Sequence, residues 1–317
     1  MRAENFKLNL DGPRNLARTL SLVENRSPLR HLILKECWKL SGKARIVGIT
    51  GPPGAGKSTL ASSLIRQFRK GSKTVGVVAV DPSSPFSGGA ILGDRIRMMD
   101  TSLDEGVFIR SVATRGAMGG LSAAAGDLVT VMDAAGFEVV IVETVGVGQD
   151  EIDIVREADS VILALVPGLG DDIQALKAGV MEIADIFVVN KADREGADKL
   201  VREIEYLLAL SPARGEWTPP VVRTVASRNE GIEDLAGKLD EHHRFLRYTA
   251  GLGEKKKQRG TDKLRKLLAE GWEKELRKGP LSAEEEEKLK EAFAERKKDP
   301  YSVAEEILGN FTWEGTE

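Results

Sequence analysis

The sequence predicts an α/β fold: a doubly wound, mostly parallel sheet with further helices at each end of the chain. Short runs rich in Val and Ile recur along the chain, as expected for strands buried on both faces. Segments with helical periodicity, such as LASSLIRQF, separate most of them, and this alternation is typical of a parallel sheet covered by helices. The strand-like runs are 44–50, 75–81, 107–113, 139–143, 161–166, 186–190 and 221–226.

Two helical segments are expected before this core, within residues 12–42. Apolar residues recur at helical spacing on both sides of Pro28, and we expect both segments to pack on the sheet. Cys37 is the chain's one cysteine, which rules out an internal disulfide framework and fits a buried, inert thiol. The expected stripes are Leu16, Leu20 and Val23, then Leu29, Leu32, Ile33 and Trp38.

After Phe245 the sequence is dense in charge and has no strand pattern, so we expect a helical arm. Ser282 is the expected N-cap of its second helix. Because the arm exceeds what one core needs, we expect it to form a dimer interface; packing against the chain's own core is the alternative. The charged run 254–260 is interpreted as a solvated linker. The predicted domains are 1–43, 44–248 and 249–317, and the arm's apolar positions are Leu264, Leu267, Leu268, Leu276, Leu289 and Phe293.

Composition argues against several classes of partner. The 46 basic and 49 acidic side chains leave a net charge of −3, so no overall basic field recruits nucleic acid or anionic lipid. The N-terminal residues lack the apolar core of a signal peptide, and no stretch approaches the roughly 18 apolar residues of a membrane span. We therefore expect a cytoplasmic protein with no nucleic-acid or membrane partner.

A phosphate-binding loop follows the first strand-like run. Residues 51–58 read GPPGAGKS, which matches G-x-x-x-x-G-K-[ST] between a strand and a helix. Glycines let the backbone N–H groups turn toward phosphate oxygens, and the helix N-terminus adds partial positive charge. We expect Lys57 to bridge the β- and γ-phosphates and the Ser58 hydroxyl to bind magnesium. The expected nucleotide-binding residues are Gly51, Pro52, Gly54, Ala55, Gly56, Lys57, Ser58 and Thr59.

The residues at 190–193 read NKAD and indicate which base is bound. The Asp193 carboxylate only accepts hydrogen bonds, and guanine offers two adjacent donors where adenine offers none. A base that left this carboxylate unpaired would be rejected by a large factor, so we predict a preference for GTP and GDP over ATP. Asn190 and Lys191 complete the expected base site, and the Ala226 N–H is placed to meet the guanine carbonyl.

A γ-phosphate sensor is predicted at the end of the fourth strand-like run, which continues Glu143-Thr144-Val145-Gly146. The Gly146 N–H can contact the γ-phosphate, and Glu143 can hold magnesium through a water or orient the attacking water. Asp81 and Asp94 flank a long polar loop and are further expected metal ligands. The predicted catalytic residues are Lys57, Asp81, Glu143 and Gly146, and the predicted magnesium site consists of Ser58, Asp81, Asp94 and Glu143.

A mobile segment, GLGDDIQALKAG, is also predicted at residues 168–179. Acids that open a helix are commonly its N-cap and first turn, and this explains Asp171 and Asp172 without any partner. That reading does not account for Lys177. The candidate switch and partner-coupling residues are Asp171, Asp172, Gln174 and Lys177.

Six segments of the chain resemble those of one known family: GPPGAGKST, VDPSSPFSGGAILGDRIRM, VETVGVGQ, GLGDDIQALKAG, NKAD and DPYSVAEEIL. Together, over nearly the whole chain, they resemble the MeaB/ArgK family of methylmalonyl-CoA mutase-associated GTPases. The resemblance implies a homodimeric G-protein chaperone that gates adenosylcobalamin delivery to an acyl-CoA mutase and protects or helps reactivate it. It also assigns Asp81, Asp94 and Glu143 to the switch and magnesium sites, and Gln174 and Lys177 to an extra switch that reports the nucleotide state to the partner.

Other functions stay open at this stage. Asp240-Glu241-His242 begins like the cobalamin motif D-x-H-x-x-G, but position 245 is Phe where the motif has Gly. We therefore assign the cobalamin cofactor to the partner. His242 and His243 are expected on a helix surface. A small-molecule kinase should prefer ATP, against the NKAD segment. A nucleotide-dependent nickel metallochaperone should carry Cys and His ligands, against one Cys and three scattered His. A purely structural nucleotide is a third alternative.

Overall fold

The structure of the chain is a computed structural model. Its two compact units are Met1–Arg259 and Gly260–Glu317, and helix α11 (Gly251–Leu276) contributes to both. The domain boundaries after residues 43 and 248 stay predictions. The structure describes residues 7–81, 104–113, 120–144, 157–168, 182–210 and 216–309, the side chains of 81, 113, 120–123 and 308 excepted.

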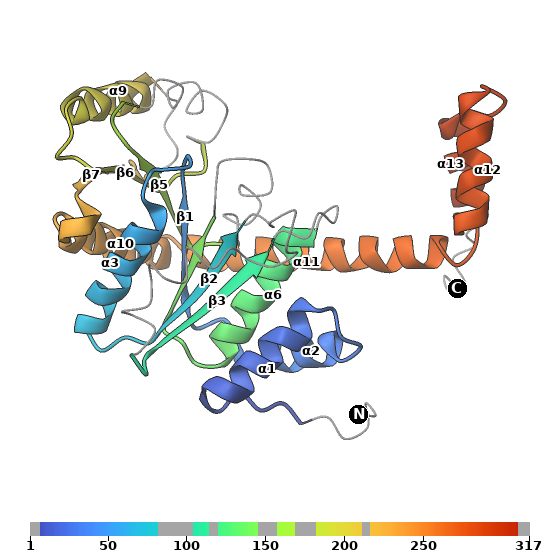
Figure 1. Ribbon diagram of the computed structural model, residues 1–317, viewed down its shortest axis with the longest axis horizontal. Coiled ribbons are helices and arrows are strands. Elements are labelled where there is room, and N and C mark those ends of the chain that lie inside the picture. The colour runs from blue at the N-terminus through green and yellow to red at the C-terminus, as the bar shows by residue number, and fades with distance from the viewer. Residues whose placement is uncertain are drawn as a thin grey trace. The chain divides into compact units, whose positions relative to one another are not determined.

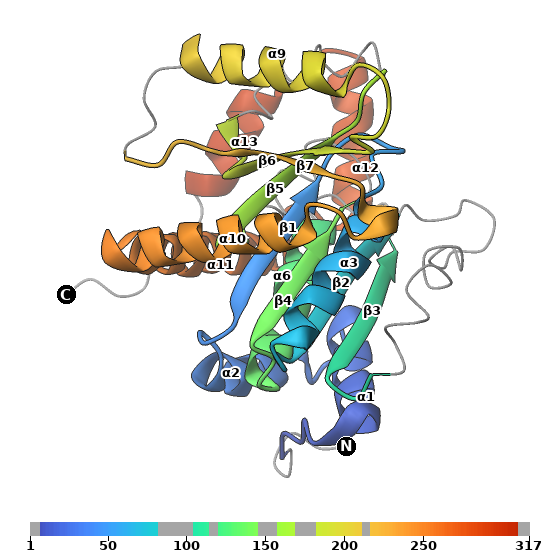
Figure 2. The same cartoon turned by 90° about the vertical axis from the view of Figure 1, so that its left-hand side faces the viewer.

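Seven strands among the described residues form one sheet, and every pair of neighbours in it is parallel. The order is β3-β2-β4-β1-β5-β6-β7, so β1 lies in the middle between β4 and β5 (Figure 2). This confirms the predicted doubly wound parallel sheet. The strands are β1 (Arg45–Thr50), β2 (Val75–Asp81), β3 (Val107–Ala113), β4 (Val139–Glu143), β5 (Ser160–Leu165), β6 (Ile186–Asn190) and β7 (Val221–Thr224).

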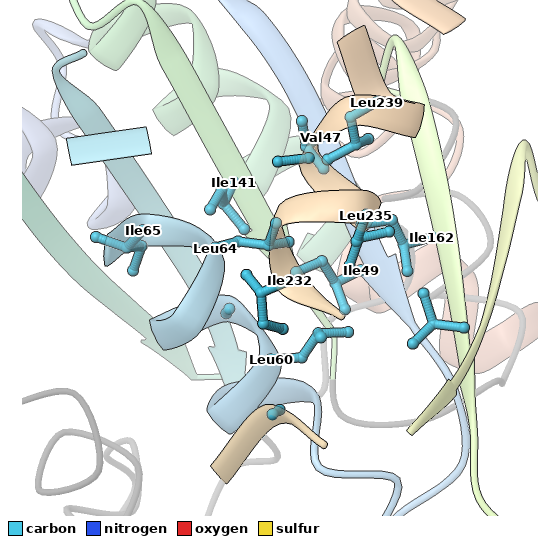
Figure 3. Packing of buried hydrophobic residues seen from close by; sticks show 14 of the residues in the cluster. Val47, Ile49, Leu60, Leu64, Ile65, Ile141, Ile162, Ile232, Leu235 and Leu239 are labelled. Carbon is cyan, nitrogen blue, oxygen red and sulfur yellow. The ribbon is translucent and has the colours of Figure 1, made fainter. Parts of the chain in front are cut away.

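One face of the sheet is covered by α3 (Lys57–Lys70) and α10 (Ile232–Tyr248). Alternate residues of β1, Val47 and Ile49, turn to this side, as the two-residue period of a strand requires. Leucines of both helices close over them, as Figure 3 shows. These residues are fully buried and fix the N-terminal turn of α3 above the end of β1; they include Leu60, Leu64, Leu235 and Leu239.

The opposite face carries α1 (Gly12–Glu24), α2 (Arg30–Leu40), α6 (Gly120–Ala134) and, over the other half of the sheet, α9 (Ala197–Leu210). The two N-terminal helices therefore pack as predicted (Figure 1). Cys37 is fully buried in this layer, which confirms the prediction for its thiol. The prediction for Trp38 is wrong, because 53% of it is exposed. The buried stripe of α2 is centred on Ile33 and Cys37, and Trp38 lies past its edge.

Three helices occupy the C-terminal region: α11, α12 (Ala283–Ala294) and α13 (Pro300–Gly309). The Ser282 side chain accepts a hydrogen bond of 3.4 Å from the Glu285 N–H, which confirms the predicted N-cap. None of the helices in the described ranges is both long and apolar enough to cross a membrane.

The charged run 254–260 is not a linker, so that expectation is wrong. It lies within α11, and its cations bind groups at the amino end of β5. Lys255 Nζ donates to the Asp159 carbonyl at 2.7 Å, and Arg259 binds the Glu157 carbonyl at 2.6 Å and the Asp159 carboxylate at 2.9 Å. Long side chains let charges on an exposed helix reach buried oxygens, which charge density alone does not reveal.

Candidate functional site

The predicted site residues converge at the carboxyl edge of the sheet. In a doubly wound sheet, ligands bind at the point where the strand order reverses. Here that point is β1, because β2, β3 and β4 lie on one side of it and β5, β6 and β7 on the other. Glu143, the last residue of β4, pairs with Ile49 of β1 on one side and Ala79 of β2 on the other. Asp81 and Asn190 end β2 and β6 at this same edge.

The loop between β1 and α3 has a backbone that only glycine accommodates at two points. Gly51 has a φ of 147°, and a Cβ there would lie 2.1 Å from the Ala164 carbonyl oxygen. Gly56, the N-cap of α3, has a φ of 83°, and its Cβ would lie 2.6 Å from Asn190 Nδ2. The glycines thus allow β5 and the end of β6 to approach the loop closely.

Lys57 is turned back into this loop. Its side chain is buried, and Nζ donates to the carbonyl oxygens of Gly51 at 2.7 Å and Pro52 at 3.0 Å. These oxygens fix the ammonium group at the start of α3, where the helix N-terminus also favours an anion. The arrangement suits the binding of phosphate oxygens.

Ser58 and Glu143 form the contact between the loop and β4. The Ser58 hydroxyl donates to Glu143 Oε1 at 2.5 Å, and the Glu143 side chain is buried. Next to them the Thr144 hydroxyl donates to the Thr50 hydroxyl at 3.1 Å, joining the ends of β4 and β1. A hydroxyl and a carboxylate are hard oxygen ligands, so this pair fits the magnesium ion that the sequence predicts.

Asn190 joins the loop to the end of the sheet. Its side chain is buried, and Nδ2 donates to the Ala55 carbonyl at 2.8 Å. Its Oδ1 accepts from the Thr224 hydroxyl at 3.1 Å and from the Ala226 N–H at 3.2 Å. One amide therefore holds together the phosphate loop, β7 and the short helix η3 (Ala226–Arg228). The contact of Ala226 with a guanine carbonyl stays a prediction.

Lys191 and Asp193 lie on the open side of this junction. Lys191 adopts a positive φ of 54°, and its Nζ donates to the Gly54 carbonyl at 2.7 Å, so its stem crosses from β6 to the phosphate loop. Asp193 Oδ2 accepts from the Arg228 guanidinium at 2.6 Å. Sequence reasoning missed Arg228, although it stands only two residues after Ala226 in the segment VASRNEGI.

Comparison with known proteins identifies the family of the chain. Residues 16–280 match the family described as methylmalonyl Co-A mutase-associated GTPase MeaB. The chain belongs to the MeaB family. A putative GTPase of Pyrococcus horikoshii is 49% identical over 298 residues, or 93% of each chain, and the GTPase ArgK of Escherichia coli is 38% identical over 278 residues, or 84% of each.

A solved structure agrees with the MeaB-family fold. It is described as an LAO/AO transport system kinase, covers 94% of this chain and 92% of its own, and matches with a TM-score of 0.72 at 28% identity. Members of the MeaB family are named as GTPases, so the ligand class of this chain is a guanine nucleotide and its reaction is GTP hydrolysis.

Most of the predicted switch and metal residues lie outside the described residues. Asp81 is placed by its backbone at the end of β2. Those outside are Asp94, Gly146, Asp171, Asp172, Gln174 and Lys177. Their assigned roles stay predictions.

A second polar cluster lies at the amino edge of the sheet, and it overturns the expectation for His242. This residue is only 1% exposed; its Nδ1 is 2.9 Å from the Ser160 hydroxyl, and its Nε2 is 3.5 Å from an Asp185 carboxylate oxygen. The Trp217 ring packs against the imidazole, with ring centroids 4.7 Å apart. The stripe Leu235, Leu239, His242 and Leu246 has helical spacing, a signal that could have revealed the burial.

The cluster changes the titration of His242. Burial lowers its pKa from 6.5 to about 4, because the charged ring would lose its hydration. The Asp185 carboxylate opposes this shift, while the positive charges of Lys255 and Arg45 add to it. The imidazole is therefore neutral at physiological pH and acts as a packing and hydrogen-bonding group.

Proposed function

We propose that this chain is a magnesium-dependent GTPase that acts as a chaperone of an adenosylcobalamin-dependent acyl-CoA mutase of the methylmalonyl-CoA mutase type. It would gate cofactor loading and protect or reactivate the mutase. The contact that carries the proposal is the hydrogen bond from Asn190 to the Ala55 carbonyl, because it sets a phosphate loop and a base-reading segment side by side. The family description supports the mutase as the client.

Phosphate binding would draw on groups that the chain already holds in place. Lys57 Nζ would exchange its two carbonyl partners for oxygens of the β- and γ-phosphates, which accept more strongly because they are charged. Ser58 and Glu143 would hold magnesium with Asp81 and Asp94. Held there, magnesium would supply positive charge that offsets the charge of the phosphate oxygens. Glu143 and the Gly146 N–H would orient the attacking water and the γ-phosphate.

Base selection would reside in Asp193. Its carboxylate accepts two adjacent N–H donors in one plane, which guanine supplies and adenine does not. Asp193→Asn should weaken GTP binding and admit xanthosine triphosphate, whose donor and acceptor pattern suits an amide. The test is the ratio of dissociation constants for GTP, XTP and ATP in both proteins. An unchanged ratio would remove Asp193 from base recognition.

We further propose that the arm makes a homodimer. None of the α11 residues is buried within one chain, and three leucines at helical spacing are exposed there. Leu264 and Leu268 are 56% and 64% exposed and lie one turn apart. Sedimentation should give a dimer for the native chain and a monomer for the Leu264→Glu, Leu268→Glu double variant. A monomeric native chain would contradict the proposal.

Coupling to the mutase would run through the segment with Asp171, Asp172, Gln174 and Lys177. Lys177→Ala should retain GTP binding and lose stimulation of hydrolysis by the mutase. We expect the complex in the cytoplasm, since a chain with one cysteine suits a reducing compartment.

A kinase remains the second candidate, because the solved relative is described as a transport system kinase. It would use ATP and transfer phosphate to a small molecule. Comparing formation of GDP from GTP with formation of ADP from ATP separates the two functions: a preference for GTP supports the chaperone, and a preference for ATP supports the kinase. A metallochaperone has less support, since Cys37 is fully buried in the helical layer and His242 contacts Ser160.

A further inference from the structure

The carboxylate that the proposed function assigns to guanine is engaged by a side chain of the protein itself. Arg228 places one guanidinium nitrogen 2.6 Å from Asp193 Oδ2. Its Nε lies 3.5 Å from a carboxylate oxygen of Glu230, so the same guanidinium lies between two acids. Both members of the closer pair are about half exposed, 54% for Arg228 and 45% for Asp193, which leaves the contact open to an incoming ligand.

The backbones that carry this pair are fixed. Arg228 is the last residue of η3, and the loop is closed on both sides by hydrogen bonds between Val225 and Glu230. The Ser63 hydroxyl of α3 donates to the Ala226 carbonyl at 2.8 Å and secures the start of η3. On the other strand end, the Ala192 N–H donates to the Thr224 carbonyl at 3.0 Å. The contact between Arg228 and Asp193 can therefore be made or broken by side-chain rotation alone.

A guanidinium group and the edge of guanine both donate hydrogen bonds to the oxygens of a carboxylate. Each presents adjacent N–H donors in one rigid plane, and each pairs with carboxylate oxygens through parallel hydrogen bonds. Two such donors cannot use the same oxygens of one side chain at once. Arg228 contacts Oδ2, one of the two oxygens that the guanine edge would use, so the base competes with Arg228 for this oxygen.

We propose that Arg228 is an internal competitor of the guanine base. It holds Asp193 while the base pocket is empty and moves to Glu230 when guanine binds. Glu230 keeps the displaced charge paired, which lowers the cost of the exchange. Arg228 thus tunes nucleotide affinity and release, and it does so only through Asp193. The inference rests on the proposed role of Asp193 in base recognition.

Removing Arg228 tests the proposal directly. Arg228→Ala should bind GDP roughly two- to fivefold more tightly, the range that the coupling of an exposed ion pair corresponds to. Dissociation of a fluorescent GDP analogue should slow by a similar factor. Arg223→Ala is the matched control, because Arg223 of β7 forms an equally close, exposed pair with Asp198 of α9. Unchanged or weaker GDP binding by Arg228→Ala would overturn the proposal.

A thermodynamic cycle separates competition from other effects of the substitution. In an Asp193→Asn background, with xanthosine diphosphate as the ligand, Arg228→Ala should have no effect, because the charged partner is gone. The same gain in both backgrounds would show that Arg228 acts elsewhere, and would overturn the inference. If Asp193→Asn itself fails to shift binding from guanosine to xanthosine nucleotides, the proposed role of Asp193 fails instead.

Glu230→Gln gives a change of opposite sign. The variant removes the charge of Glu230, so Arg228 pairs with Asp193 more of the time. GDP binding should therefore weaken by up to about twofold. A loop that merely needs both side chains for its fold would lose affinity in both variants. Tighter binding in Arg228→Ala together with weaker binding in Glu230→Gln is therefore the signature of competition.

Discussion

Ser58 donates a hydrogen bond of 2.5 Å to Glu143 and so joins the first turn of α3 to the last residue of β4. One residue comes from the phosphate loop and the other from the strand that leads into the predicted γ-phosphate sensor. We predict that Glu143→Gln lowers the single-turnover rate of GTP hydrolysis by about 10²-fold, as for the loss of one preorganised charged group. It should also raise the magnesium concentration needed for half-maximal rate.

The control for this prediction is Ser62→Ala. Ser62 lies one turn further along α3, and its hydroxyl donates to the Ser58 carbonyl, away from Glu143. This variant should hydrolyse GTP at close to the native rate. If Glu143→Gln hydrolysed GTP at the native rate and with the native magnesium dependence, the predicted role of Ser58 and Glu143 in the reaction would be wrong.

Asn190 provides a prediction about stability. Asn190→Ala deletes three hydrogen bonds in a buried position and leaves the Ala226 N–H without its acceptor. We expect a loss of roughly 2–3 kcal/mol in the free energy of unfolding, measured by urea denaturation without nucleotide. Asp193→Asn, at an exposed position nearby, should leave stability within about 0.5 kcal/mol of the native value. Equal stability of Asn190→Ala and the native protein would contradict this role.

Much of the fold was predictable, because its signals are local. The β-branched runs mark strands that are buried on both faces, and these are the strands of the parallel sheet. The phosphate loop and the residues 190–193 follow strands in the sequence, so their meeting at the carboxyl edge follows from parallel topology. The convergence of Ser58, Glu143 and Asn190 could be derived before any coordinates were known.

Contacts between distant elements were not predictable in this way. Arg228 reaches Asp193 across two strand ends, and nothing in the spacing of 35 residues indicates it. Arg259 reaches Asp159 from a helix that looks solvated by composition. His242 is a different case: it lies on the apolar stripe of α10, so its burial was predictable from helical spacing.

His242 makes stability depend on pH. Its folded pKa of about 4 lies below the ordinary 6.5, so the unfolded chain takes up the proton first as the pH falls. The stabilisation by the neutral, buried ring is present above about pH 6.5 and is lost between 6.5 and 4. Between pH 7.5 and 5 we expect a loss on the order of 2 kcal/mol.

Comparing two variants isolates this contribution. His242→Gln should remove most of the pH dependence in that interval, because an amide does not titrate. His31→Gln, at an exposed position on α2, should keep it. Urea denaturation at both pH values gives the change in the free energy of unfolding between them. An equal change in the native protein and both variants would show that His242 is not the titrating group.

Arg259 provides a prediction for the root of the arm. The Asp159 carboxylate is 1% exposed and also accepts the Ile46 N–H at 2.9 Å, so it stays buried when its cation is removed. Arg259→Ala should therefore lower the free energy of unfolding by about 3 kcal/mol. Arg277→Ala, which removes an exposed pair with Glu273 further along the chain, should have no measurable effect. Equal stability of the two variants would contradict the assignment.

The most direct test of the central claim is the steady-state rate of GTP hydrolysis by this chain, alone and with an adenosylcobalamin-dependent acyl-CoA mutase from the same source. We predict slow hydrolysis alone, large stimulation by the mutase, and no stimulation in Lys177→Ala. Native GTP hydrolysis that the mutase leaves unchanged would contradict the proposed client while retaining the GTPase.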